Sequence, residues 1–342
     1  MCLDFSDDQR RALQRRVSVL QGQAHAFNTR ATYRVGVLAF LRFCLYFGLI
    51  YSPPSDDTLA AFVAHQSRTC SFKTLKVYLA GVRTFVLSRG FPFTPWGERY
   101  PVFRAMQGCK RVFGDSTTRK LAVTPVLLLQ MRSHLNLHVH NDVMIWGAML
   151  LAFYCLLRKD NIAVGKSRKF NPRNNLCVGD FVWYEGTLWV RIRHSKVIQF
   201  EERIHWVPLV AMPGHPLCPV EAMAAVLSRS SKAGAATPAF TWKGPKESLV
   251  EKGSIQALTH VIFVKTFKYL VQLCGLDWTK YSGHSFRRGG ATFALGIGGD
   301  PDLVKVLGDW KSDVYLIYKE TTVARRLSLP MAMSAAILNG NA

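Results

Sequence analysis

The segment "YSGHSFRRGGATF", residues 281–293, brings an imidazole and two guanidinium groups close together in the chain. His284 and Arg287 are three positions apart, which places them on one face of a helix. An imidazole that moves a proton, beside a guanidinium that neutralises negative charge, suits chemistry at a phosphodiester. Arg288 is expected to point elsewhere, as a DNA-backbone or structural contact, and Tyr281 to pack in the core. An HxxR pair is common by chance, so its meaning depends on what joins it.

Two further basic residues stand at the ends of expected elements. An apolar helix over 143–157 stops at "RKDN", so Arg158 lies at the polar end of a rigid buried helix. A guanidinium held there can bind two phosphate oxygens at once. The ordinary alternative is a basic helix end that faces its own dipole. Lys196 lies between two expected strands, where it can reach into a groove and donate a proton. Hairpin tips also carry lysine simply because they are exposed to water.

Aromatic residues gather in "GDWKSDVYLIY", near the end of the chain. Tyr315 and Tyr318 are three residues apart and share a helical face, and aromatic packing is the simple interpretation. Trp310 is also compatible with a core position, although its indole N–H needs an acceptor when it is buried.

Taken in order, these residues resemble the active site of the tyrosine recombinases, also called phage-integrase-type recombinases. The resemblance covers the whole chain, with a helical N-terminal part like their core-binding domain and residues from about 116 onward like their catalytic domain. Within the family, residues 283–318 most resemble the recombinases of eukaryotic mobile elements, the DIRS-like retrotransposons and Cryptons, in which a tryptophan followed by Lys-Ser-Asp precedes the tyrosine. The residues that carry the resemblance are Arg158, Lys196, His284, Arg287, Trp310 and Tyr318.

The resemblance implies roles for these residues in cutting and rejoining DNA. Tyr318 would attack a scissile phosphodiester and form a 3′-phosphotyrosine, while Arg158 and Arg287 hold the nonbridging oxygens. Lys196 would protonate the leaving 5′-oxygen, and His284 would assist the proton of the tyrosine or hold the phosphate. No metal, ATP or other cofactor is implied, and the sequence contains neither a carboxylate cluster suited to Mg²⁺ nor a G-x-x-x-x-G-K-[ST] loop.

Three departures from the family pattern bear on these roles. Most bacterial relatives have the nucleophile nine residues after the second histidine or tryptophan, whereas Tyr318 lies eight after Trp310 and Tyr315 five; the mobile-element pattern favours Tyr318. Many relatives have an acid three residues after the first arginine, where this chain has Asn161 and the nearest acid is Asp160. Trp310 is a hydrogen-bond donor only, so it can orient a phosphate or close the site but cannot carry a proton.

The composition indicates a polyanionic partner. The chain has 342 residues, enough for about two domains, and 44 Lys and Arg against 22 Asp and Glu give a net charge of +22. This charge favours double-stranded DNA over a small-molecule substrate or a membrane. Eight scattered cysteines without a CxxC pair favour free thiols, and the N-terminus lacks a signal-peptide pattern, so an intracellular protein is expected, nuclear if the host is a eukaryote and otherwise cytoplasmic.

The helices and strands expected from the sequence, which must position these residues, indicate a mainly α fold with a small antiparallel sheet (α+β). The expected domains are a DNA-gripping core-binding domain at 1–114, a linker at 115–123 and a catalytic domain with its tail at 124–342. The apolar runs 36–51 and 143–157 are interpreted as core helices, because the first contains Arg42 and the second is shorter than the roughly 20 residues of a membrane span. The expected helices are 28–49, 55–65, 71–87, 124–135, 143–157, 219–227, 254–274, 284–295, 301–307 and 312–318, and the expected strands lie within 176–184, 187–194 and 203–210.

Two other functions fit part of this pattern. A type IB topoisomerase would share the chemistry and relax DNA as a monomer, and a DNA-binding protein descended from a recombinase would have lost catalysis. The complete set of site residues argues against the second. The apolar segment "PMAMSAAILNG", residues 330–340, argues mildly against the first, because in the family such a tail often docks on a neighbouring protomer. A homo-tetramer on two duplexes is therefore expected.

Overall fold

The computed structural model divides into two compact units, Met1–Thr118 and Arg119–Ala342. It describes residues 7–115, 119–165, 169–230, 234–244, 255–318 and 330–335. The division falls inside the segment 115–123, which was expected to be a linker.

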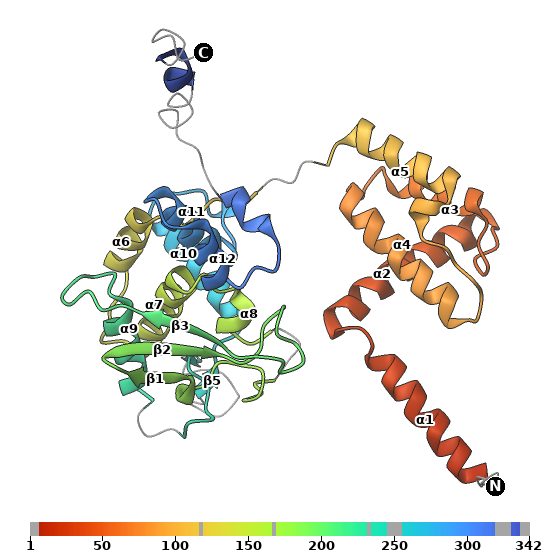
Figure 1. Cartoon of the computed structure of the whole chain (residues 1–342). Helices are drawn as coiled ribbons and strands as arrows, with labels where there is room; N and C mark the ends of the chain where they lie inside the picture. Colours follow the sequence, from red (N-terminus) through yellow and green to blue (C-terminus); the bar gives the residue numbers. More distant parts are fainter. Residues whose placement is uncertain are drawn as a thin grey trace. The chain divides into compact units, whose positions relative to one another are not determined.

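The described residues of the first unit form helices joined by turns and loops, without a strand. Two of its three sequence-predicted helices begin at capping serines, since the side chains of Ser55 and Ser71 accept hydrogen bonds from the backbone N–H groups of Thr58 and Thr74. Two further helices, one at each end of the unit, were not predicted. The five are α1 (Asp7–Gln23), α2 (Phe27–Phe47), α3 (Asp56–Gln66), α4 (Phe72–Ser88) and α5 (Tyr100–Phe113) (Figure 1).

The core of this unit forms between α2, α3, α4 and α5. α2 contacts α4 and α3 contacts α5, and the buried faces supply interlocking aromatic and aliphatic side chains. The rings of Phe40 and Phe62 meet edge to face at 5.2 Å, a favourable arrangement for an aromatic pair. α1 has no buried residue, so packing within its own unit contributes little to its stability.

The second unit combines α-helices and short 3₁₀ turns with two small antiparallel sheets, which confirms the mainly α fold class with a small sheet. Its helices are α6 (Pro125–Ser133), α7 (His140–Tyr154), α8 (Lys159–Ile162), α9 (Pro219–Ser228), α10 (His260–Leu273), α11 (Ser285–Gly296), α12 (Pro301–Leu307) and a terminal 3₁₀ turn over Asp313–Tyr318. Its strands are β1 (Phe181–Tyr184), β2 (Thr187–Ile192), β3 (His205–Leu209), β4 (Thr241–Lys243) and β5 (Ile255–Ala257).

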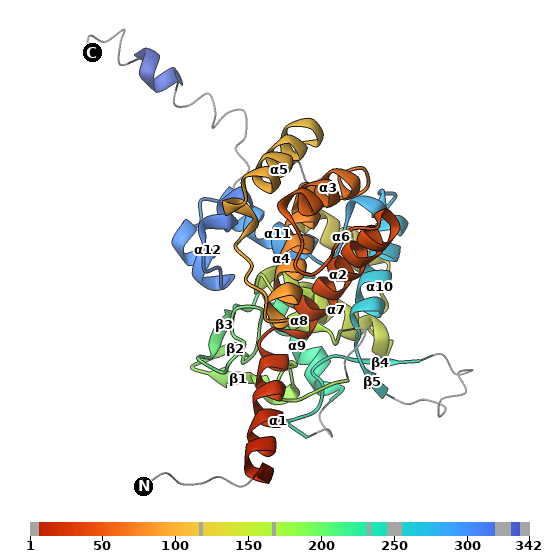
Figure 2. The same ribbon diagram turned by 90° about the vertical axis from the view of Figure 1, so that its right-hand side faces the viewer.

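The three strands predicted from the sequence form one sheet in the order β1-β2-β3. β1 and β2 are joined by a tight turn in which both Glu185 and Gly186 have positive φ. Alternate residues of β2 are buried, namely Leu188, Val190 and Ile192, so one face of the sheet covers the core. In Figures 1 and 2 the strands lie in the lower part of the unit, below α10, α11 and α12.

Two local predictions were wrong. The helix expected to start at residue 254 starts at His260 instead, because residues 255–257 pair with β4 to form a two-stranded ribbon. The helix expected over 312–318 is a 3₁₀ turn over 313–318. In both places a local apolar pattern was compatible with a helix, and long-range pairing or chain geometry decided otherwise.

α7 is the central helix of this unit. Residues 143–153 are all buried, and α7 contacts α9, α11 and β4 (Figure 1). This packing explains the long apolar run in the sequence. Among the described residues, no helix has both the length and the apolar character needed to cross a membrane.

Candidate active site

The start of α11 carries His284 and Arg287, and packing fixes the arginine firmly. Arg287 is 2% exposed. Its Nη1 donates to the carbonyl oxygen of Leu156, and its Nη2 donates to that of Gly308 over 2.6 Å. Its guanidinium carbon lies 3.7 Å from the centroid of the Trp310 ring, a stacked cation–π contact. Arg287 therefore joins the end of α7 to the segment that follows α12.

Two glycines that follow the arginine allow this arrangement. A Cβ atom at Gly289 would meet the backbone of Val123, and one at Gly290 would meet the carbonyl oxygen of Phe153. Both separations would be well under 3.0 Å, which is closer than Cβ atoms approach other heavy atoms in proteins. α11 thus lies against backbone on two sides, and any side chain here would push it away. The sequence offered no firm account of these glycines: Gly290 sets the distance between α11 and the end of α7, and Gly289 sets the distance between α11 and the chain at Val123.

His284 lies beside the tyrosine that the resemblance favoured. The Nε2 atom of His284 and the Oη atom of Tyr318 are 3.0 Å apart, within hydrogen-bonding distance. The Thr292 hydroxyl donates to the backbone oxygen of Tyr318 over 3.1 Å, which ties the 3₁₀ turn to α11. Tyr315 is also buried, and the rings of both tyrosines pack 5.9 Å from that of Trp310. Of the two candidate nucleophiles, Tyr318 is the one whose hydroxyl contacts the imidazole.

Burial and positive charge shape the electrostatics of the site. Desolvation, and then the charges of Arg287, Arg158 and Lys196, lower the pKa of His284, although much of the residue remains open to solvent. The imidazole is therefore neutral at pH 7 and can accept a proton. Desolvation and the neighbouring Arg158 lower the pKa of Arg287 to about 9, so it remains a cation at neutral pH.

Arg158 lies at the start of α8, directly after the turn that ends α7. It is half-buried, and desolvation lowers its pKa while the charges of Asp309, Tyr318 and Asp160 oppose that change. Arg158 and Arg287 lie close enough to His284 for their charges to lower its pKa. A pair of guanidinium groups beside a hydroxyl and a neutral imidazole is suited to binding a phosphodiester and activating the hydroxyl against it.

The acid and the amide that follow the first arginine face different neighbours. The carboxylate of Asp160 lies 2.9 Å from Nε2 of His260 and 3.5 Å from Nζ of Lys159, and these contacts, the histidine first, lower its pKa to about 2. Asn161 is buried, and its Nδ2 donates to the carbonyl oxygen of His194 over 3.0 Å. Asn161 therefore contacts the chain just before Lys196, whereas Asp160 faces His260 and Lys159.

Lys196 is exposed in the connection between β2 and β3. It lies close enough to the site to affect the imidazole of His284, and its carbonyl oxygen accepts a hydrogen bond from Gln199 over 2.6 Å. Arg288 lies outside the site, because its Nη1 donates to the carbonyl oxygen of Lys120 over 2.6 Å. Tyr281 packs against Phe267 in the core, as expected.

One acidic residue of the site was not singled out from the sequence. Asp309 precedes Trp310 and contacts the β2–β3 connection, where Ser195 and Arg203 bind its two carboxylate oxygens. Its negative charge raises the pKa of both Arg158 and Arg287. The letters "GDW" carry no sign of this contact, because the partners lie more than 100 residues earlier.

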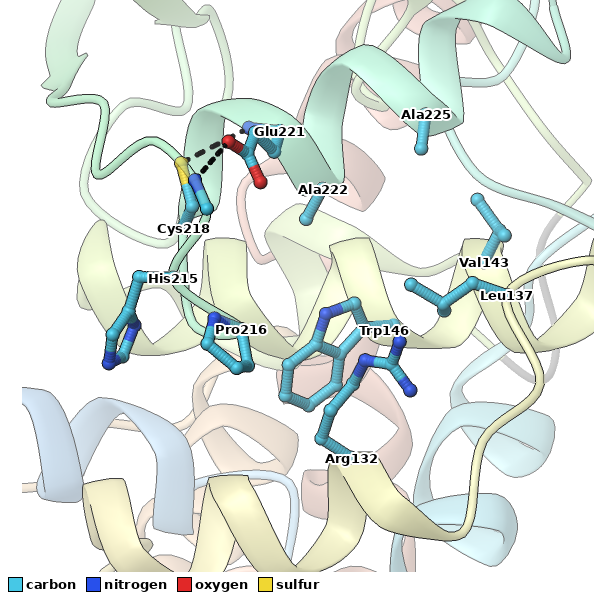
Figure 3. A pocket seen from close by; sticks show the side chains of 11 residues that line it. Arg132, Leu137, Val143, Trp146, His215, Pro216, Cys218, Glu221, Ala222 and Ala225 are labelled. Carbon is cyan, nitrogen blue, oxygen red and sulfur yellow. Dashed lines mark hydrogen bonds between the residues drawn. The ribbon is translucent and has the colours of Figure 1, made fainter.

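A hollow elsewhere in the second unit does not belong to this site. It has a volume of about 350 Å³ and lies between α6, α7 and α9 (Figure 3). Trp146 and Leu137 give it apolar walls, and Arg132 and Glu221 supply charge. None of the six predicted site residues lines it. Within the described ranges, no group of three His, Cys, Asp or Glu side chains is arranged to hold a metal ion.

Comparison with known proteins identifies the fold. No family profile and no curated protein matches the sequence, but solved structures do. The XerH site-specific recombinase bound to a palindromic difH substrate matches with a TM-score of 0.56 and 15% identity, over 90% of this chain and 79% of its own. A lambda integrase dimer bound to a COC′ core site matches with a TM-score of 0.55 and 14% identity, over 90% of this chain and 76% of its own. The chain therefore has the fold of the tyrosine recombinases, as the sequence predicted.

Proposed function

We propose that the protein is a tyrosine recombinase that cuts and rejoins DNA strands, with Tyr318 as its nucleophile. The observation that carries the proposal is the 3.0 Å contact between the Tyr318 hydroxyl and the neutral imidazole of His284, beside two desolvated guanidinium groups. A hydroxyl, a base and a paired cation are the parts that transfer of a phosphodiester to tyrosine needs.

The chemistry follows from these positions. The Tyr318 oxygen attacks the scissile phosphorus and forms a 3′-phosphotyrosine bond as the bond from phosphorus to the 5′-oxygen breaks. The tyrosine proton passes to Nε2 of His284, and Lys196 gives a proton to the leaving 5′-oxygen. In the return step a 5′-hydroxyl of the partner strand gives its proton to Lys196 and attacks phosphorus, and the tyrosine oxygen leaves and regains its proton from His284. The phosphodiester count is unchanged, so rejoining needs no ATP.

Arg158 and Arg287 would hold the nonbridging oxygens. The terminal nitrogens of Arg287 already donate to the carbonyl oxygens of Leu156 and Gly308, and its buried Nε has no acceptor among the described residues. A guanidinium has five N–H donors, so donors remain for a phosphate oxygen. The carbonyl contacts would hold the group in place before DNA binds, which is what electrostatic stabilisation of a transition state requires.

Double-stranded DNA is the proposed partner. The net charge of +22 favours a polyanion, and the XerH and lambda integrase structures are complexes with a difH substrate and a COC′ core site. The first unit would grip the DNA backbone. Trp310 followed by Lys-Ser-Asp supports a role in a eukaryotic mobile element of the DIRS-like or Crypton kind, and hence action in the nucleus.

A tetramer on two DNA sites is proposed from the C-terminal segment. Its described part, 330–335, is helical with exposed side chains, including Met331 and Met333. Residues 336–340 of the expected docking tail lie outside the described residues. Exposed apolar side chains at a chain end fit a segment that docks on a neighbouring protomer.

Covalent capture would test the proposal. The protein is incubated with a pool of duplexes that have a randomised core and a nick near its centre, so that cleavage releases a short fragment and traps the protein–DNA adduct. We expect an adduct that withstands denaturation, and sequencing of its DNA should reveal a common site. Tyr318→Phe should abolish it, whereas Tyr315→Phe should retain it. Failure of the wild-type protein to form any adduct would refute the enzyme proposal, and adducts without sequence preference would favour a topoisomerase.

A further inference from the structure

The lysine proposed as the acid sits at the tip of a tightly built turn. The backbone N–H of Ser195 donates to the carbonyl oxygen of Ile198 over 2.9 Å. The Ser195 hydroxyl accepts from the N–H groups of Val197 and Ile198 over 3.1 and 3.2 Å. Ser195 and Ile198 are buried, while Lys196 is exposed. The direction of Lys196 is therefore set by whatever holds Ser195.

Asp309 holds this turn from the other side of the site. One carboxylate oxygen accepts from the Ser195 hydroxyl over 3.4 Å, and the other is paired with Nη2 of Arg203. Ser195 and Arg203 flank Lys196 in the chain, so the connection is fastened on both sides of the lysine. The side chain of Asp309 is only 13% exposed, and a pair with one partly buried member is screened less than a surface pair.

The segment that carries Asp309 is itself anchored to the phosphate-binding groups. Asp309 has φ of 54°, a left-handed conformation that aspartate tolerates better than most residues. The residue before it, Gly308, accepts from Nη2 of Arg287, and the residue after it, Trp310, stacks on the same guanidinium. A second link joins the same parts, because a ring nitrogen of His205 in β3 lies 3.0 Å from the carbonyl oxygen of Leu307.

We propose that Asp309 is a positioning residue that fastens the Ser195–Ile198 turn, and with it the amine of Lys196, to the segment that carries Trp310. The inference rests on the proposed cleavage chemistry, in which Lys196 protonates the leaving 5′-oxygen. Asp309 itself touches no reacting atom. It makes the acid and the phosphate clamp parts of one assembly, so that they reach the scissile bond together.

The test uses Asp309→Asn in the full-length protein, with Asp313→Asn as the matched control. Both changes remove one carboxylate charge from the same stretch of chain, but Asp313 is 70% exposed and pairs with Lys305 at the surface. Single-turnover cleavage is measured on a nicked duplex from the capture experiment. A general acid contributes about 10²- to 10⁴-fold to a rate, and partial misplacement of the lysine should slow Asp309→Asn by about 10- to 100-fold. Asp313→Asn should stay within about twofold of the wild type, as expected for an exposed pair.

A chemical rescue separates misplacement of the acid from a general defect. When sulfur replaces the 5′-bridging oxygen, the leaving group departs as a thiolate and needs no proton. Lys196→Ala and Asp309→Asn should then both recover to near the wild-type rate on the sulfur substrate. If Lys196→Ala recovers and Asp309→Asn does not, Asp309 acts through the arginines or the fold, and the inference is overturned.

The double variant Lys196→Ala/Asp309→Asn tests independently whether Asp309 acts through Lys196. If Asp309 acts through Lys196, adding Asp309→Asn to Lys196→Ala should slow cleavage by no more than about twofold. A full additional loss would contradict the inference while leaving the proposed enzyme function intact. If the wild-type protein itself forms no adduct, the proposed function fails, and the role assigned to Asp309 in it fails too.

Amide hydrogen exchange tests, without any DNA, whether Asp309 holds the Ser195–Ile198 turn. The amides of Ser195, Val197 and Ile198 are hydrogen-bonded within the turn, so they should exchange faster in Asp309→Asn and unchanged in Asp313→Asn. Equal protection in Asp309→Asn and the wild type would show that the carboxylate does not hold the turn, whatever the catalytic result.

Discussion

A single methyl group at Gly290 should displace the guanidinium of Arg287. In an open helical position, replacing glycine with alanine stabilises by about 0.5 to 1 kcal/mol. At Gly290 the new Cβ would meet the backbone oxygen of Phe153 and the side chain of Leu156, and forcing an extra methyl into packed structure costs about 1 to 3 kcal/mol. Gly296, in the same helix, has open space where a Cβ would lie, with nothing within 4 Å, and provides the control. Both alanines gain the same helical preference, so Gly290→Ala should be less stable than Gly296→Ala by the cost of the forced methyl alone, about 1 to 3 kcal/mol.

The assay is chemical denaturation of both variants and the wild type, followed by covalent capture at a temperature where all three are folded. Arg287 bonds to the carbonyl oxygen of Leu156, next to the place where the helix must move away. Cleavage by Gly290→Ala should fall by about tenfold or more, since small misplacements at an active site have large effects. Equal stability of Gly290→Ala and Gly296→Ala would refute the close approach, and lower stability with unchanged cleavage would refute its link to Arg287.

Three further predictions concern single groups. In the proposed mechanism the neutral form of His284 accepts the tyrosine proton. Its pKa is lowered from 6.5, so the cleavage rate should be full above about pH 6.5 and fall as pH drops through the lower folded-state value. A pH–rate profile that is flat there, or that is the same in His284→Asn, would contradict this. Asp180→Asn should lower the free energy of unfolding by about 3 kcal/mol, the low end for a broken buried pair, because Asp180 is 1% exposed and binds two partly exposed arginines. Chemical denaturation measures this loss, and a loss under about 1 kcal/mol would mean that the pairs are weak. Trp310→Ala should lower the free energy of unfolding by about 3 to 5 kcal/mol. Trp310→Phe should lower it clearly less, because phenylalanine keeps a ring over Arg287. Equal losses in the two variants on denaturation would argue against the stacked contact.

The sequence predicted the elements whose local signals are strong. Thr124, Ser55 and Ser71 each cap the helix that follows them, and the β-branched and aromatic alternation located all three strands of the larger sheet. α5 and the β4–β5 ribbon were missed. α5 begins at a Tyr-Pro pair without a side-chain cap, and β5 is only three residues long and pairs with a strand far away in the chain.

In the candidate site, too, residues with a local sequence signal were predicted and a residue defined by long-range contacts was missed. His284, Arg287 and Tyr318 were found because their types and order resemble a known arrangement, and the contact between His284 and Tyr318 supports the choice of Tyr318 over Tyr315. Asp309 was missed because its partner Ser195 lies 114 residues away. No local pattern encodes such a contact, since it exists only after β2, β3 and α12 have packed together.

If Tyr318 is the nucleophile, it becomes covalently attached to DNA, and peptide mapping of the trapped adduct detects that bond. The adduct is digested with nuclease and protease, and the peptide that retains a nucleotide is sequenced by mass spectrometry. We expect a 3′-linked nucleotide on Tyr318 and none on Tyr315. A nucleotide on Tyr315 or on any other residue would show that Tyr318 is not the nucleophile.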